Sequence, residues 1–149
     1  MAGTPLAAEV ERHSIVYRQY APYEVISTAY ISAAELVRLK MIEEMLDIYY
    51  NRGGFSYTIA YLIETVGAGA FRFYEKLADF YYTSDFQHRD RKKDDQYRIL
   101  LAFARTLAQE RDEPAIEETA LKMLTRDAEA SMNPENLKRF LRKGWEITR

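Results

Sequence analysis

From Ser32 onward the sequence repeats one pattern, in which apolar residues recur at helical spacing until a helix-stopping residue follows. The first helix is expected to begin at Ser32, because Ser32 and Glu35 have the spacing of a capping box. Gly53-Gly54 supplies its stop. The residues of its main apolar stripe are Leu36, Leu39, Ile42, Leu46 and Tyr49, with Val37, Met41, Met45 and Ile48 on flanking rows. More than one side of this helix is therefore expected to be buried.

The same pattern continues to the end of the chain and predicts further helices. A second helix is expected to be capped by Ser56 and to end at Gly67, and a third to run from about Gly69 to Tyr82. A fourth carries Tyr97, Leu100, Leu101, Ala104 and Leu107 as its buried stripe. The start signals of a fifth and a sixth helix are Asp112 with Pro114, and Asn133 with Pro134, and the sixth is interrupted near Gly144.

The segment before Ser32 has a different character. Ile15 to Thr28 is rich in aromatic and β-branched residues and is punctuated by Pro22, which favours one or two short strands. The predicted fold is therefore mainly α: an irregular antiparallel array of five to six helices, preceded by a short extended or β N-terminal arm. We expect residues 1–31 to form this arm and residues 32–149 to form the helical domain.

The composition excludes several functions. The 149 residues include no cysteine, so this chain supplies no disulfide, thiolate metal ligand or cysteine nucleophile. The formal net charge of −2 creates no field that would steer nucleic acid or an anionic membrane onto the surface. No apolar run approaches the roughly 20 residues of a membrane helix, and Met1 to Leu6 does not read as a signal peptide. We expect a soluble, cytoplasmic protein without nucleic-acid or membrane partners.

Residue types that carry chemistry are present, but not in a catalytic pattern. Glu43 and Asp47 share one helix face, yet a di-iron site would require Glu-x-x-His pairs, and neither His13 nor His88 follows a glutamate by three. A solvated helix face is the favoured interpretation of these carboxylates. No phosphate loop, dinucleotide fingerprint or nucleophile elbow occurs. We therefore predict no catalytic, cofactor-binding or metal-binding residue in this chain.

The segment from Thr83 to Asp95 is a polar, strongly charged connection. Its basic cluster, His88 to Lys93, is followed at once by Asp94 and Asp95, which weaken the field of that cluster. The alternatives are a nucleic-acid site and a solvated loop, and the second is favoured. The connection is expected to be mobile and to lack apolar anchors.

The chain has an unusually large number of aromatic residues, 12 tyrosines and seven phenylalanines. Their helical spacing places most of them in the core. Adjacent pairs such as Tyr49-Tyr50 and Tyr81-Tyr82, however, must point partly in different directions. Some tyrosines are therefore expected to line an interface, where an apolar ring with a polar tip is favoured.

One string of residues resembles a known family. It comprises Gly3-Thr4-Pro5, Tyr17 to Tyr20, Pro22-Tyr23-Glu24-Val25, Thr28, Ile31-Ser32, Glu35-Leu36-x-Arg38-Leu39-Lys40, Ile42-Glu43 and Tyr49-Tyr50-Asn51. The string is similar to the C-terminal region of bacterial radical SAM proteins of the cobalamin-binding type. These are often described as Fe–S oxidoreductases or as anaerobic magnesium-protoporphyrin monomethyl ester cyclases, and their last region is a helical domain of unknown function. The similarity is dense over about residues 3 to 55 and loose afterwards.

The resemblance implies that this chain is an accessory domain of a larger enzyme. The parent protein would be a cyclase- or methyltransferase-like oxidoreductase that uses S-adenosylmethionine, a [4Fe-4S] cluster and, in the cobalamin-binding type, cobalamin. Its cobalamin domain and cysteine-containing barrel would lie upstream, with Gly3-Thr4-Pro5 near the end of that barrel. The expected role is to cover the barrel mouth, to hold a substrate or to dock a partner. The alternative is a free-standing helical module for protein interaction or ligand sensing, with no catalytic role.

The N-terminal arm is the expected contact with the upstream barrel. A ribbon has two faces and the helices can cover only one, so the other should meet the barrel or pair with a second copy of the chain as a homodimer. Tyr17, Tyr20 and Tyr23 are the candidates for this contact, with Arg18 and Glu24 setting its polarity. The alternative is that the arm folds onto the helices as ordinary core.

Overall fold

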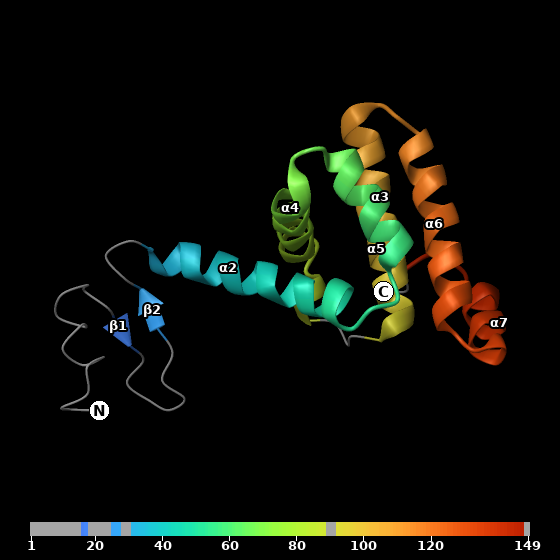
Figure 1. Cartoon of the computed structure of the whole chain (residues 1–149), viewed down its shortest axis with the longest axis horizontal. Coiled ribbons are helices and arrows are strands. Elements are labelled where there is room, and N and C mark those ends of the chain that lie inside the picture. Colours follow the sequence, from blue (N-terminus) through green and yellow to red (C-terminus); the bar gives the residue numbers. More distant parts are fainter. Residues whose placement is uncertain (1–15, 18–24, 28–30, 89–91, 148–149) are drawn as a thin grey trace. The chain divides into compact units, whose positions relative to one another are not determined.

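A computed structural model describes residues 16–17, 25–27, 31–88 and 92–147 of the chain (Figure 1). The chain divides into two compact units, Met1–Glu43 and Glu44–Arg149. The predicted mainly α fold is confirmed, because the described residues form six α-helices and one small pair of strands.

The first unit contains the strand pair and most of helix α2. Strands β1 (Val16–Tyr17) and β2 (Val25–Ser27) pair antiparallel, with Val16 opposite Ser27 and Tyr17 opposite Val25. The predicted capping box is confirmed at the start of α2 (Ala33–Leu46). The backbone N–H of Glu35 donates to Oγ of Ser32 over 3.2 Å, and the N–H of Ser32 donates to Oε2 of Glu35 over 2.8 Å. These bonds satisfy amides that have no partner within the helix.

Helix α2 runs into a π-helical turn, Asp47–Asn51, which separates it from α3. Gly53 and Gly54 follow with φ angles of 72° and 93°, a left-handed conformation that favours glycine. The carbonyl of Gly54 accepts a hydrogen bond of 2.8 Å from the Tyr97 hydroxyl, which fixes this turn to the helices behind it. The predicted Gly53-Gly54 stop is confirmed.

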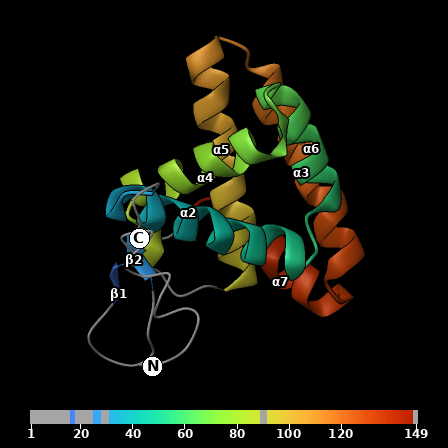
Figure 2. The same cartoon turned by 60° about the vertical axis from the view of Figure 1, so that its left-hand side comes forward.

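The second unit contains five further helices. They are α3 (Ser56–Val66), α4 (Gly69–Thr83), α5 (Lys93–Arg111), α6 (Ala115–Ser131) and α7 (Pro134–Lys143). Helix α3 packs against α4 and α6, and α6 packs against α5 and α7. Figure 1 shows α5 and α6 as an antiparallel pair joined by a short connection, and in Figure 2 α4 crosses α5. This arrangement is an irregular helical array rather than a bundle with parallel axes.

The core of the second unit is aromatic where α4 meets α5. The Phe103 ring lies edge to face against Phe73 and Phe80, with ring centroids 5.8 and 5.5 Å apart. Phe73 is completely buried, as are Tyr97, Leu100 and Ala104 of the predicted α5 stripe. Burying a phenylalanine or leucine side chain in this core stabilises the fold by about 1.5–3 kcal/mol.

The start of α3 is held by a residue from α6. The Asp127 carboxylate accepts hydrogen bonds from the backbone N–H groups of Tyr57 and Thr58, at 3.1 and 2.9 Å, and from the Thr58 hydroxyl at 2.6 Å. The prediction that Ser56 caps this helix is wrong, because Ser56 is its first residue and Asp127 supplies the acceptor. Asp112 likewise does not cap α6: it ends α5 in a left-handed conformation, with a φ of 52°.

The connection after α4 differs from its expected form. Residues Phe86–His88 form a short 3₁₀ turn, and the Phe86 ring lies 5.7 Å from Phe80 and 5.9 Å from Tyr81 between centroids. The prediction that this connection lacks apolar anchors is therefore wrong for its described part. In the part of the chain that the structure describes, no helix is long and apolar enough to cross a membrane.

Candidate functional site

A groove with tyrosine walls opens on the second unit, between the π-helical turn, α3 and α4. Its volume is about 560 Å³. We call it the tyrosine groove, and the described residues that line it are Leu46, Tyr49, Tyr50, Gly53, Ser56, Ile59, Ala60, Ile63, Ala70 and Tyr74. Its size lies within the range of small-molecule sites, about 300–1,000 Å³.

The π-helical turn directs its two tyrosines to opposite environments, as predicted for adjacent aromatic residues. Tyr49 is 2% exposed, and its hydroxyl is hydrogen-bonded to the Tyr81 hydroxyl and donates to the backbone carbonyl of Gln96 over 3.4 Å. Tyr50 is 70% exposed at the edge of the groove. π-helical turns occur frequently at functional sites. Here the turn buries one ring in the wall and leaves the next in solvent.

Tyr74 of α4 is the unusual residue of this wall. It is 3% exposed, and its hydroxyl has no hydrogen-bond partner among the described residues. Burial raises the pKa of Tyr74, and the nearby Tyr50 raises it further. The hydroxyl is therefore neutral at physiological pH and is available to donate or accept one hydrogen bond.

The described lining of the groove is mainly aromatic and aliphatic. None of its described lining residues is an aspartate, glutamate, lysine, arginine or histidine. Tyr49 and Tyr81 are also poor acids, because burial raises the pKa of both well above the ordinary value. A site without a titratable group near neutral pH offers no general acid or base, whereas its aromatic and aliphatic walls can hold an apolar group.

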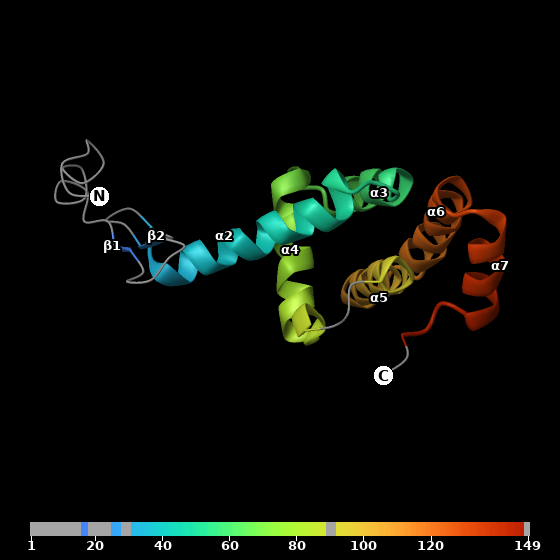
Figure 3. The ribbon, with the colours of Figure 1, turned by 90° about the horizontal axis from the view of Figure 1, so that it is seen from below.

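A second pocket of similar size, about 610 Å³, lies where the C-terminal tail crosses α5. We call it the arginine pocket, and its described lining residues are Thr83, Ser84, Asp85, Phe86, Arg98, Leu101, Ala102, Arg105, Trp145, Glu146 and Ile147. Figure 3 shows the tail returning from α7 toward α5. Both arginines belong to α5 and are seven residues apart, so they lie on one face of the helix.

Arg98 fastens the tail at the inner end of this pocket. Its Nε donates to the Gly144 carbonyl over 2.9 Å and its Nη1 pairs with Asp95 over 3.0 Å, while its side chain is only 6% exposed. The guanidinium carbon also lies 4.9 Å from the centroid of the Phe140 ring, which in turn packs against Trp145 at 4.9 Å. Hydrogen bonds and a cation–π contact thus compensate the buried charge.

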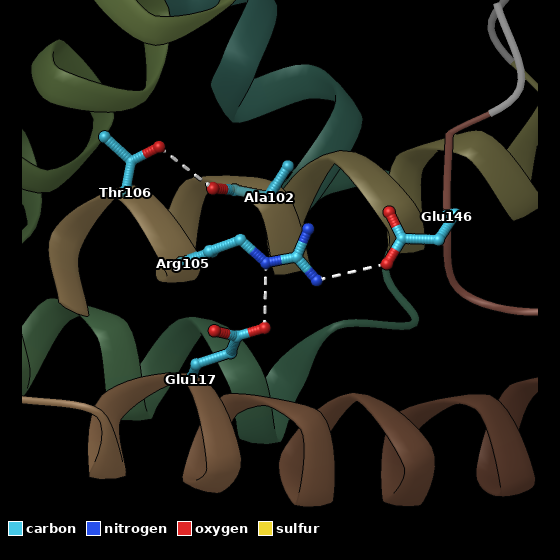
Figure 4. A network of polar contacts seen from close by, with 5 residues as sticks. All are labelled: Ala102, Arg105, Thr106, Glu117 and Glu146. Atoms are coloured by element: carbon cyan, nitrogen blue, oxygen red, sulfur yellow. Dashed lines mark hydrogen bonds and ion pairs between the residues drawn. The ribbon is translucent and has the colours of Figure 1, made fainter. Parts of the chain in front are cut away.

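Arg105 forms the outer link between α5, α6 and the tail (Figure 4). Its Nε donates to Glu117 over 2.8 Å, and its Nη2 donates to Glu146 over 3.2 Å. Hydrogen bonds to Glu117 and then to Glu146 raise the pKa of Arg105. Carboxylates of the same chain are thus paired with both arginines of the pocket. An anion would have to compete with these carboxylates in order to bind there.

Most of the candidate residues from the sequence analysis are not among the residues that line the tyrosine groove or the arginine pocket. Arg18, Tyr20, Tyr23, Glu24 and His13 lie outside the described residues, and Tyr17 and His88 are described through their backbone alone. Asp47 pairs with Arg52 at 3.0 Å instead of converging with other acids. Among the described residues there is no group of three or more potential metal ligands of the types His, Cys, Asp and Glu.

Sequence reasoning missed the polar residues that organise the second unit. Asp127 carries a detectable signal, since it follows Ala120 and Leu124 by seven and three residues and so continues the buried stripe of α6. An acid on an apolar stripe indicates a buried carboxylate with partners. Tyr74 was assigned to the core, which is confirmed, but its unpartnered hydroxyl has no sequence signal.

The comparisons with known proteins identify the family. The family described as "Protein of unknown function (DUF4080)" matches residues 11–147. The chain therefore belongs to the DUF4080 family, and the match covers the strand pair and all the described helices. No curated protein and no solved structure matches this chain.

Proposed function

We propose that this chain is a non-catalytic accessory helical domain of a radical SAM enzyme of the cobalamin-binding type, and that it holds a substrate or partner in the tyrosine groove. The observation that carries the binding role is the wall of the groove, which is aromatic and aliphatic and has no ionisable residue apart from its tyrosines among the described residues. The enzyme context is supported by the resemblance of residues 3–55 to the C-terminal region of those proteins.

The chain's own residues do not fit the iron–sulfur cluster of such an enzyme. A [4Fe-4S] cluster with three protein ligands requires three thiolates, and this sequence has no cysteine. The cluster, S-adenosylmethionine and cobalamin therefore belong to the remainder of the enzyme in this proposal, and the domain contributes binding and shielding from water. Its contact with the barrel is assigned to the arm, through Tyr17, Tyr20 and Tyr23, with Arg18 and Glu24 beside them.

An antibody raised against residues 32–149 tests the enzyme context. On a blot of extract from the source cells, we expect a band far above the 17.5 kDa of this chain. Protein precipitated anaerobically with the antibody should contain iron and should cleave S-adenosylmethionine. A single band near 17.5 kDa without iron would support the free-standing module instead.

Hydrogen exchange tests the assignment of the arm. We expect backbone amides of residues 15–28 to exchange faster in the separate chain than in the parent enzyme, because docking excludes water from the ribbon. Residues 97–107 of α5 serve as the internal control and should be equally protected in both. Equal protection of residues 15–28 in the two proteins, together with a strictly monomeric chain, would make the arm ordinary core.

A further inference from the structure

We propose that the tyrosine groove binds an uncharged, mainly apolar small molecule whose single hydrogen-bonding oxygen pairs with the Tyr74 hydroxyl. This inference rests on the binding role assigned to the groove above and names the class of ligand. It is independent of the enzyme to which the domain belongs.

The first reason is the Tyr74 hydroxyl itself. The residue is 97% buried (3% exposed), lies in the groove wall, and has no hydrogen-bond partner among the described residues. Buried hydroxyl groups in native proteins are nearly always hydrogen-bonded, so an unpaired one requires an explanation. An oxygen atom of a ligand would supply the missing partner.

The second reason is the composition of the wall. Leu46, Ile59 and Ile63 provide aliphatic surface, and the Tyr49 ring is held in place because its hydroxyl is bonded to Tyr81 and Gln96. A charged ligand would lose its hydration without gaining a counter-charge from the described lining residues. The groove therefore favours a neutral molecule with apolar rings or chains.

The third reason is the fit in size and the form of the edge. A volume of about 560 Å³ accommodates a molecule of one or two fused rings with a side group. The exposed ring of Tyr50 lies at the edge of the groove, where it can cover one face of an occupant. A protein partner is the competing occupant, and the experiment below separates the two.

The probe for this site is 6-propionyl-2-(dimethylamino)naphthalene, an uncharged fluorescent naphthalene ketone with one strong acceptor oxygen. Titrated with the full chain, it should bind saturably with a micromolar dissociation constant and a blue-shifted emission. Tyr74→Phe removes the hydroxyl alone and should weaken binding about fivefold, the usual effect of one neutral hydrogen bond. Ala60→Phe fills the groove from the exposed middle of α3 and should weaken binding at least about tenfold.

Matched variants keep the result interpretable. Tyr82→Phe removes an exposed hydroxyl of the same helix as Tyr74, and Ala130→Phe adds a ring on the exposed face of α6. Both should bind the probe like the wild type, and circular dichroism should show that all four variants are folded. The absence of probe binding to the wild type, or equal binding by Ala60→Phe, would overturn the proposal. Equal binding by Tyr74→Phe would overturn the role of Tyr74, and neither outcome would alter the blot that tests the enzyme context.

Discussion

The tyrosine groove and the arginine pocket have similar volumes but opposite chemistry. The groove has apolar walls, and its buried hydroxyl at Tyr74 lacks a partner among the described residues. The arginine pocket has charged walls, yet Arg98 and Arg105 are both paired within the chain. The fold leaves a buried hydroxyl of the tyrosine groove without a partner. The charged groups of the arginine pocket, in contrast, are already paired and stabilise the fold.

This difference is the basis of our proposal that the tyrosine groove binds a ligand and that the arginine pocket has a structural role. In the arginine pocket, a ligand would have to compete with Glu146 and the Gly144 carbonyl for the guanidinium groups. In the groove, a ligand would satisfy a group that the chain leaves unpaired and would displace water from apolar surface. The predictions below test whether each region has the role that its hydrogen bonds imply.

The largest effect is expected from Asp127, whose carboxylate holds the start of the groove helix α3. Asp127→Ala removes three hydrogen bonds and leaves two backbone N–H groups and the Thr58 hydroxyl without their acceptor. We expect urea denaturation to show a loss of about 3 kcal/mol. Glu129→Ala, an exposed acid on the same helix, is the control and should change stability by less than about 0.5 kcal/mol. Equal effects would show that the cap does not stabilise α3.

Arg98 is expected to have the next largest effect, at the structural pocket. Arg98→Met keeps most of the buried stem but removes the bonds to Gly144 and Asp95, which should cost about 2 kcal/mol. Trp145 is the single tryptophan of the chain, so its emission reports directly on the tail and should shift to the red. Arg105→Met, on the same face of α5 but partly exposed, is the control and should cost less than about 1 kcal/mol. An unchanged Trp145 emission in Arg98→Met would contradict the anchoring role.

Alkaline pH should destabilise the protein through the buried tyrosines. Burial raises the pKa of Tyr81 above the ordinary value of about 10, so this hydroxyl stays protonated in the folded state while it ionises in the unfolded state. The contribution of the protonated Tyr81 hydroxyl to the free energy of unfolding is therefore complete below pH 10. It is lost as the pH rises from there toward the raised pKa, and about 1.4 kcal/mol is lost at pH 11. Urea denaturation at pH 8 and pH 11 measures it. Tyr81→Phe should show a smaller loss than the wild type, and an identical loss would contradict this explanation.

A matched pair of substitutions tests the partnered and the unpartnered hydroxyl. Tyr81→Phe removes the hydrogen bond to Tyr49 and should cost about 1 kcal/mol. Tyr74→Phe removes a buried hydroxyl without a described partner and should leave stability unchanged or slightly increased. Thermal denaturation of the two variants under the same conditions gives the comparison. A loss in Tyr74→Phe as large as that in Tyr81→Phe would mean that Tyr74 is already satisfied.

A small effect is also expected at the outer link of the tail. Glu146 is 81% exposed where it meets Arg105, so Glu146→Gln should change stability by no more than about 0.5 kcal/mol. The wild-type contact should also weaken with salt, because exposed ion pairs are screened. Denaturation at low and high salt measures both effects. A loss comparable to that of Arg98→Met would show that the link between Arg105 and Glu146 holds the tail as strongly as Arg98 does.

Local signals in the sequence were enough to predict the helices. The capping box of Ser32 and Glu35, the Gly67 stop and the Asn133 cap act within four residues, and each is present in the structure. The opposite exposures of Tyr49 and Tyr50, 2% and 70%, likewise follow from their adjacency on one turn. The predictions at Ser56 and Asp112 failed because each assigned a helix cap to a residue next to the helix in sequence. In the structure, Asp127 of α6 supplies the acceptor for α3, and Asp112 ends α5.

By itself, the sequence determined a mainly α chain with many aromatic residues in its core, since helix caps and apolar periodicity depend on neighbours along the chain. Only the tertiary structure decided which tyrosine lies in a groove wall without a partner, which acid caps α3, and which arginine fastens the tail. Asp127 is 69 residues from Thr58, and Arg98 is 46 from Gly144. Such pairings depend on how the helices cross, and side-chain packing between distant segments sets that crossing.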